Sequence, residues 1–84
     1  MHTCHATGCP LHVPERMFLC KTHWFRLPKP LRDRIWATYV DGQEERKDPS
    51  RAYCQAAIEC VRYLAAYEGR TSDTRLYEML MPEA

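Results

Sequence analysis

The feature that most constrains this chain is a group of four metal-ligating residues near its N-terminus. Cys4 and Cys9 form one close pair, Cys20 and His23 form a second, and the full spacing is C-x4-C-x10-C-x2-H. Two such pairs separated by a loop are typical of a tetrahedral site that holds structural zinc. A chain of 84 residues has a small core, so a cross-link of this kind is expected to stabilise it. The spacing predicts one structural zinc ion bound by these four side chains.

Neighbouring histidines leave the ligand set open at this stage. His2, His5 and His12 lie in the same segment, so His5 or His12 is an alternative to one of the four, with His5 closest to Cys4. The remaining cysteines, Cys54 and Cys60, are six residues apart on a predicted helix and therefore lie on different faces of it. We interpret these two as buried free thiols.

The cysteine count and the first residues indicate the cellular compartment. The five cysteines are an odd number, and the opening residues lack the basic and then apolar run of a secretion signal. No apolar run approaches the roughly 20 residues needed to cross a bilayer. We expect a cytoplasmic protein without membrane contact, in which clustered cysteine and histidine bind metal rather than form disulfides.

Helical patterns begin only after the metal-ligating segment. Proline in the first turn and apolar residues on one face predict a helix from Pro28 to Asp41–Gly42. A charged loop should follow over 43–47. Asp48 as cap and Pro49 as first residue predict a second helix that runs close to Gly69. Its apolar stripe is formed by Tyr53, Ala56, Ala57, Cys60, Val61, Leu64 and Tyr67, with Tyr63 outside it.

A third, shorter helix is predicted from about Asp73 to Met81, capped by Thr71 or Ser72 and offering three apolar side chains, Leu76, Met79 and Leu80. We therefore expect a mostly α fold and a single domain over 1–84. Residues 1–27 would form a zinc-binding head of loops and turns, with room for a small hairpin, and 28–84 a helical body of two main helices plus the short C-terminal one.

Charge and aromatic residues suggest a binding surface. Residues 15–34 contain six basic side chains against two acidic ones, while the whole chain carries a net charge of only +1. We call these six residues the basic belt: Arg16, Lys21, Arg26, Lys29, Arg32 and Arg34. Trp24 lies among them and is a candidate contact residue. Core packing between head and body is nevertheless the favoured role for Trp24 and Trp36.

Two kinds of partner are compatible with these features. The basic belt could contact nucleic-acid phosphates, although the small net charge is unlike the strongly basic balance of most nucleic-acid modules. Alternatively, the helices present to another protein a surface with basic residues at one end and acidic segments at the other. An enzyme is disfavoured, because Cys20 and His23 are better used as metal ligands and no residue is placed to complete a catalytic triad with them.

Several stretches of the first half of the chain resemble a group of small zinc-finger-like proteins encoded by tailed bacteriophages and prophages. They are C-H-A-T-G-C (4–9), V-P-E-R-M-F-L-C-K-T-H-W (13–24), L-P-K-P-L-R-D-R-I-W-A-T-Y (27–39) and D-G-Q (41–43). The resemblance covers residues 4–43 and matches Cys4, Cys9, Cys20 and His23 to that group's presumed ligands. It implies an accessory protein inside a bacterial cell that binds and modulates a bacterial or phage protein of nucleic-acid metabolism or defence. Direct binding of DNA or RNA is the alternative.

Overall fold

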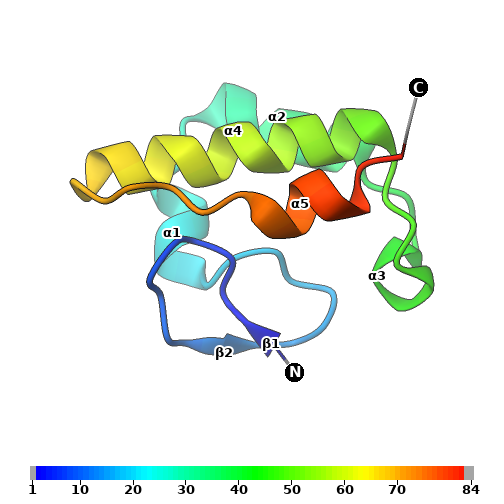
Figure 1. Ribbon diagram of the computed structural model, residues 1–84, viewed down its shortest axis with the longest axis horizontal. Helices are drawn as coiled ribbons and strands as arrows, with labels where there is room; N and C mark the ends of the chain where they lie inside the picture. Colours follow the sequence, from blue (N-terminus) through cyan, green and yellow to red (C-terminus); the bar gives the residue numbers. More distant parts are fainter. Residues whose placement is uncertain (1, 83–84) are drawn as a thin grey trace.

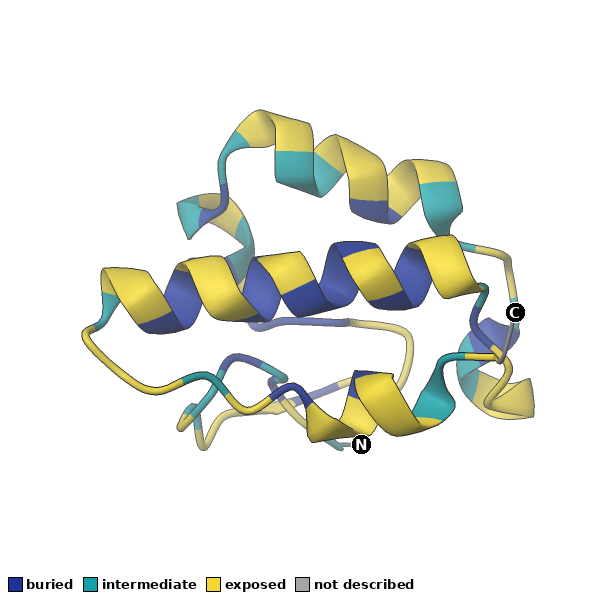
Figure 2. Ribbon diagram, turned by 45° about the horizontal axis from the view of Figure 1, so that its top comes forward, coloured by how far each residue is buried: buried dark blue, intermediate teal, exposed yellow. Residues whose placement is uncertain are grey.

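A 17-residue helix, α4 (Arg51–Tyr67), forms the centre of the structure, a computed structural model that describes residues 2–82. Helix α2 (Lys29–Thr38) packs along one side of α4 and α5 (Arg75–Leu80) along another (Figures 1 and 2). The N-terminal residues form a separate layer beneath α4 and α5. This mostly α arrangement, with two main helices and a short C-terminal one, is the predicted one.

The sequence of α4 explains most of its burial. Tyr53, Ala57, Cys60 and Leu64 recur every three or four residues, and all are less than a tenth exposed. Burial of this stripe is the main hydrophobic contribution to the core. Cys54 and Cys60 are fully buried free thiols, as predicted.

Both ends of α4 depart from the sequence-based prediction. The helix begins at Arg51, two residues later than predicted, because the Ser50 hydroxyl rather than Asp48 accepts a hydrogen bond from the Tyr53 N–H at 3.1 Å. At the other end, Tyr67 was expected in the buried stripe but is 64% exposed. Tyr67 is the last residue of the helix, and its ring lies 4.9 Å from the guanidinium of Arg26.

Helix α2 is shorter and less buried than predicted, since it ends at Thr38 and buries only Ile35 fully. Trp36 was expected in the core but is 66% exposed. Adjacent residues of a helix are about 100° apart around its axis, so Trp36 points away when Ile35 faces the core. Its ring instead contacts the half-buried Trp24 edge-on at 6.1 Å, which joins the two helices at the surface.

The shorter helices differ from prediction in similar ways. A one-turn helix, α3 (Gln43–Arg46), replaces the expected charged loop and follows Gly42, whose φ is +84°. Helix α5 begins at Arg75, after Thr74 rather than Thr71 or Ser72. It buries Tyr77, whereas Leu76 and Met79 are 44% and 83% exposed. Prediction failed here because a six-residue helix is too short to establish a reliable hydrophobic period.

The N-terminal segment contains a small hairpin and a helix. Strands β1 (His2–Thr3) and β2 (His12–Val13) pair antiparallel, with His2 opposite Val13. Helix α1 (Lys21–Arg26) lies where the sequence predicted only loops and turns. The C-terminal tail is docked on this segment, because the Asp73 N–H donates to the Thr7 hydroxyl at 3.0 Å. None of the helices in residues 2–82 is long and apolar enough to cross a membrane.

Candidate metal centre

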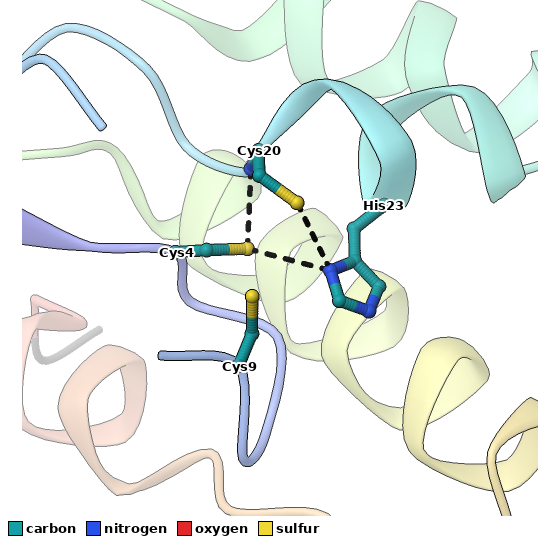
Figure 3. A group of neighbouring side chains, drawn as sticks. All are labelled: Cys4, Cys9, Cys20 and His23. Atoms are coloured by element: carbon teal, nitrogen blue, oxygen red, sulfur yellow. Dashed lines mark hydrogen bonds between the residues drawn. The ribbon is translucent and has the colours of Figure 1, made fainter. Parts of the chain in front are cut away.

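The hairpin and α1 bring the four predicted ligands together. Cys4 follows β1, Cys9 lies in the turn toward β2, Cys20 precedes α1 and His23 lies in its first turn. Their sulfur and nitrogen atoms all lie within 4.8 Å of one another and point toward a common centre (Figure 3). All five cysteines are free thiols. The structure therefore confirms that these four residues are placed to hold one metal ion.

Local backbone geometry prepares this arrangement. Gly8 has a φ of +80°, which allows the tight turn in which the Cys9 N–H donates to the Ala6 carbonyl at 3.0 Å. Across the site, the Cys20 N–H donates to the Cys4 sulfur at 3.1 Å. A backbone N–H directed at a sulfur stabilises the thiolate form that a metal ion requires.

The two nitrogens of His23 have different roles. Nδ1 faces the sulfurs, 3.2 Å from that of Cys20 and 3.7 Å from that of Cys4. Nε2 lies 3.0 Å from a carboxylate oxygen of Glu68. A carboxylate accepts hydrogen bonds only, so the Nε2–H donates to Glu68 and Nδ1 is left free to bind the metal.

Glu68 itself is also held by two arginine side chains. Arg26 donates to the same carboxylate oxygen at 3.1 Å, and the Arg70 Nε lies 3.5 Å from the other oxygen. The hydrogen bond from His23, followed by the charges of Arg70 and Arg26, lowers the pKa of Glu68 below its usual range. The carboxylate therefore stays ionised at neutral pH and orients the histidine ring.

Sequence reasoning missed Glu68, and no local signal pointed to it. The residue lies 45 positions after His23, just beyond the end of α4, and a carboxylate at the end of a helix is unremarkable in a sequence. Only the tertiary fold, which brings α1 to the C-terminal end of α4, makes it a neighbour of His23.

In the metal-free protein the thiols have different acidities. Burial raises the pKa of the Cys4 thiol to about 12. Burial also acts to raise the pKa of Cys20, but opposing effects, led by the hydrogen bond from the His23 backbone N–H, outweigh it and the net shift is downward. A cation must displace the thiol protons when it binds, so the affinity of this site for metal increases with pH.

The alternative histidines lie outside the ligand group. The His5 ring stacks on His2, with 4.6 Å between ring centroids, and meets Tyr77 edge-on at 5.4 Å. Burial lowers the pKa of His5 to about 4, so its ring is neutral at physiological pH. His12 is an exposed residue of β2. The group close enough to share one ion consists of Cys4, Cys9, Cys20 and His23.

The structure distributes the predicted binding residues among different contacts. Arg16 and Lys21 are exposed, and Trp24 is half-buried against Trp36. Arg32 lies 5.7 Å from the Phe25 ring. The other three members of the basic belt form ion pairs within the chain: Arg26 with Glu68, Lys29 with Asp33 and Arg34 with Glu59. Half of the basic belt is thus balanced by carboxylates of the same chain.

Comparison with family models, with curated proteins and with solved structures finds no match to this chain. Its function is therefore argued from the geometry of the metal centre and the surface around it.

Proposed function

We propose that this protein is a zinc-stabilised binding module without enzymatic activity, in which Cys4, Cys9, Cys20 and His23 hold one structural zinc ion. The observation that carries the zinc assignment is the convergence of three thiols and one imidazole within 4.8 Å. Thiolate-rich sets with one histidine suit zinc, and four protein ligands fill its tetrahedral shell. A filled shell leaves no coordination position for a substrate, which supports a structural rather than a catalytic role.

The contacts around the four ligands support this role. Cys4, Cys20 and His23 are buried, Cys9 is half-buried, and the carboxylate of Glu68 orients the ring of His23. A zinc ion there would join the turn after β1 to the start of α1, and through Glu68 to the end of α4. Metal-binding free energy then becomes folding free energy.

We further propose that the module binds and modulates a bacterial or phage protein of nucleic-acid metabolism or defence, as the resemblance to phage zinc-finger-like proteins implies. The ion pairs of Arg26, Lys29 and Arg34 support a protein partner, because charges already paired within the chain attract phosphates less strongly. Exposed aromatic side chains add to this argument, since Trp36 is 66% and Phe25 61% exposed. Large aromatic residues on a surface are characteristic anchors of protein interfaces.

The first test measures zinc and partner together. Elemental analysis of purified protein should give one zinc per chain, and Cys9→Ser should abolish this and lower the melting temperature. A tagged pull-down from bacterial lysate should retain a stoichiometric protein after nuclease treatment. Trp36→Ala should weaken that capture while leaving the zinc content unchanged, because Trp36 lies outside the metal centre.

Direct binding of nucleic acid is the competing outcome. Capture that disappears after nuclease, together with salt-sensitive binding of DNA or RNA that is weakened in a Lys29→Ala, Arg32→Ala double variant, would replace the protein partner by a nucleic acid. Protein with no bound zinc and with unchanged melting after Cys9→Ser would refute the structural zinc ion.

A further inference from the structure

A second feature of the molecule lies away from the metal centre, where the hairpin, α3, α4 and α5 meet. A pocket of about 180 Å³ opens there, and its lining includes Phe18, Tyr53, Tyr77 and Gln43. A larger hollow of about 480 Å³ adjoins it, because the two share lining residues at Arg16, Met17 and Tyr39. The larger hollow extends to the indole rings of Trp24 and Trp36, and we call the two neighbouring hollows together the aromatic groove.

The smaller pocket contains polar groups that lack partners. Tyr53 and Tyr77 are only 7% and 6% exposed, and within residues 2–82 neither hydroxyl forms a hydrogen bond. Gln43 is 4% exposed and accepts a hydrogen bond from the Val40 N–H through Oε1. That bond fixes the orientation of the amide, so its NH₂ group is left as a donor without a partner among the described residues.

These groups face the pocket rather than the sealed core. Among residues 2–82, the one fully enclosed side-chain polar atom without a hydrogen bond is Nε of Arg32. The hydroxyls of Tyr53 and Tyr77 and the amide of Gln43 therefore remain accessible from the pocket that these residues line. Burial raises the pKa of both tyrosines well above the usual range, so both hydroxyls stay protonated and can donate.

We propose that this groove binds an extended peptide of the partner protein. One apolar side chain of the peptide enters the smaller pocket, its backbone carbonyls accept hydrogen bonds from Tyr53, Tyr77 and Gln43, and a second apolar side chain contacts Trp24 and Trp36. This inference deepens the proposed function and rests on it, because it assigns the surface that a protein partner would use.

The surroundings favour a peptide over a nucleic acid. The lining of the two hollows includes the carboxylates of Glu15, Glu44 and Asp41 against the cations Arg16 and Lys47. A polyanionic backbone finds no net positive charge on this mixed rim. A neutral peptide backbone has the required carbonyl acceptors and needs no such charge. The small pocket is also below the range usual for drug-sized ligands and suits one side chain.

The test uses NMR on the zinc-loaded protein with capped dipeptides, N-acetyl-X-glycine amide, where X is leucine, phenylalanine, tryptophan, lysine or aspartate. The three apolar probes should shift the ring signals of Tyr53 and Tyr77 and the side-chain amide of Gln43, with dissociation constants on the order of millimolar. A Tyr53→Phe, Tyr77→Phe double variant keeps both rings and should bind at least about fivefold more weakly. Tyr63→Phe, at the surface of α4 and outside both hollows, is the matched control and should bind normally.

Three results would overturn the assignment. They are an absence of shifts at these residues up to tens of millimolar probe, equal affinity in the double variant and the parent, and stronger shifts there with uridine monophosphate than with the apolar dipeptides. The pull-down separates this inference from the function on which it rests. Capture of the same partner by parent and double variant would refute the groove alone, whereas the absence of any nuclease-resistant partner would refute the proposed protein-binding function.

Discussion

Glu68 provides the sharpest test of the metal centre, because it binds no metal itself and yet orients a ligand. We predict that Glu68→Gln and Glu68→Ala both weaken zinc binding without removing any of the four ligands. The carboxylate oxygen lies 3.0 Å from Nε2 of His23, and the Glu68 side chain is only 22% exposed. A contact this short and partly shielded from water holds the ring in the orientation that the metal requires.

The expected size follows from what each substitution removes. Loss of a carboxylate behind a metal-ligating histidine typically costs 10- to 100-fold in metal affinity, or about 1.4–2.8 kcal/mol. Glutamine keeps an oxygen that accepts the His23 hydrogen bond and loses only the charge, so we expect about tenfold. Both substitutions leave Arg26 and Arg70 without their anion, but alanine also removes the oxygen that accepts the His23 hydrogen bond, so for Glu68→Ala we expect about 100-fold.

The assay is competition for zinc against a chromophoric chelator at fixed pH, with the melting temperature of the metal-free protein measured in parallel. Cobalt substitution supplies a second readout, since a misoriented imidazole alters the visible spectrum of the bound ion. Glu59→Gln is the matched control. It breaks an exposed ion pair with Arg34, remote from the ligands, and should leave zinc affinity unchanged.

A zinc affinity of Glu68→Ala within twofold of the parent would refute the reasoning. Equal weakening in Glu68→Ala and Glu59→Gln would contradict it as well, because the effect would then be general destabilisation. A lower melting temperature of the metal-free Glu68→Ala protein with unchanged zinc affinity would show that the residue acts only on the fold.

Three other predictions concern the fold. Leu64→Ala, at a fully buried position of α4, should lower the free energy of unfolding by about 2–5 kcal/mol in urea titration, and a loss below 1 kcal/mol would contradict its core role. Gly8→Ala and Gly69→Ala both force alanine into a positive φ, and the Arg70 nitrogen 2.7 Å from the new Cβ at Gly8 ends a flexible, exposed side chain that can move aside, so differential scanning calorimetry should show similar losses of about 1–3 kcal/mol for the two variants. Burial raises the pKa of the Cys60 thiol from 9.0 to about 12. The stabilising contribution of the buried thiol is complete below pH 9 and is lost as the pH rises toward 12, because in that window the unfolded state loses the thiol proton while the folded state keeps it. The free energy of unfolding of Cys60→Ala, measured in urea, should therefore depend less on pH in that window than that of the parent protein.

The metal ligands illustrate how far local sequence patterns reach. Two close pairs of potential ligands were sufficient to predict that Cys4, Cys9, Cys20 and His23 lie together, because short turns and one helical turn fix the geometry within each pair. The choice against His5 was different. It depended on the hairpin turning that ring toward His2 and Tyr77, which no spacing rule describes.

The helices show the same division. Repetition over 17 residues made the buried stripe of α4 predictable, since a long amphipathic pattern averages out single exceptions. Trp36 was expected in the core but is exposed, and the burial of Tyr77 was not predicted, because α2 and α5 are short and their orientation is set by packing against α4.

The sequence by itself determined the ligand types, the order of the main helices and the apolar face of α4, all of which depend on residues close together in the chain. Only the tertiary structure placed Glu68 behind His23, paired Arg26 with Glu68 and Arg34 with Glu59, and gathered Tyr53, Tyr77 and Gln43 around one pocket. The physical reason is that these contacts join residues far apart in sequence, whose proximity arises from the packing of α1, α2 and α5 around α4.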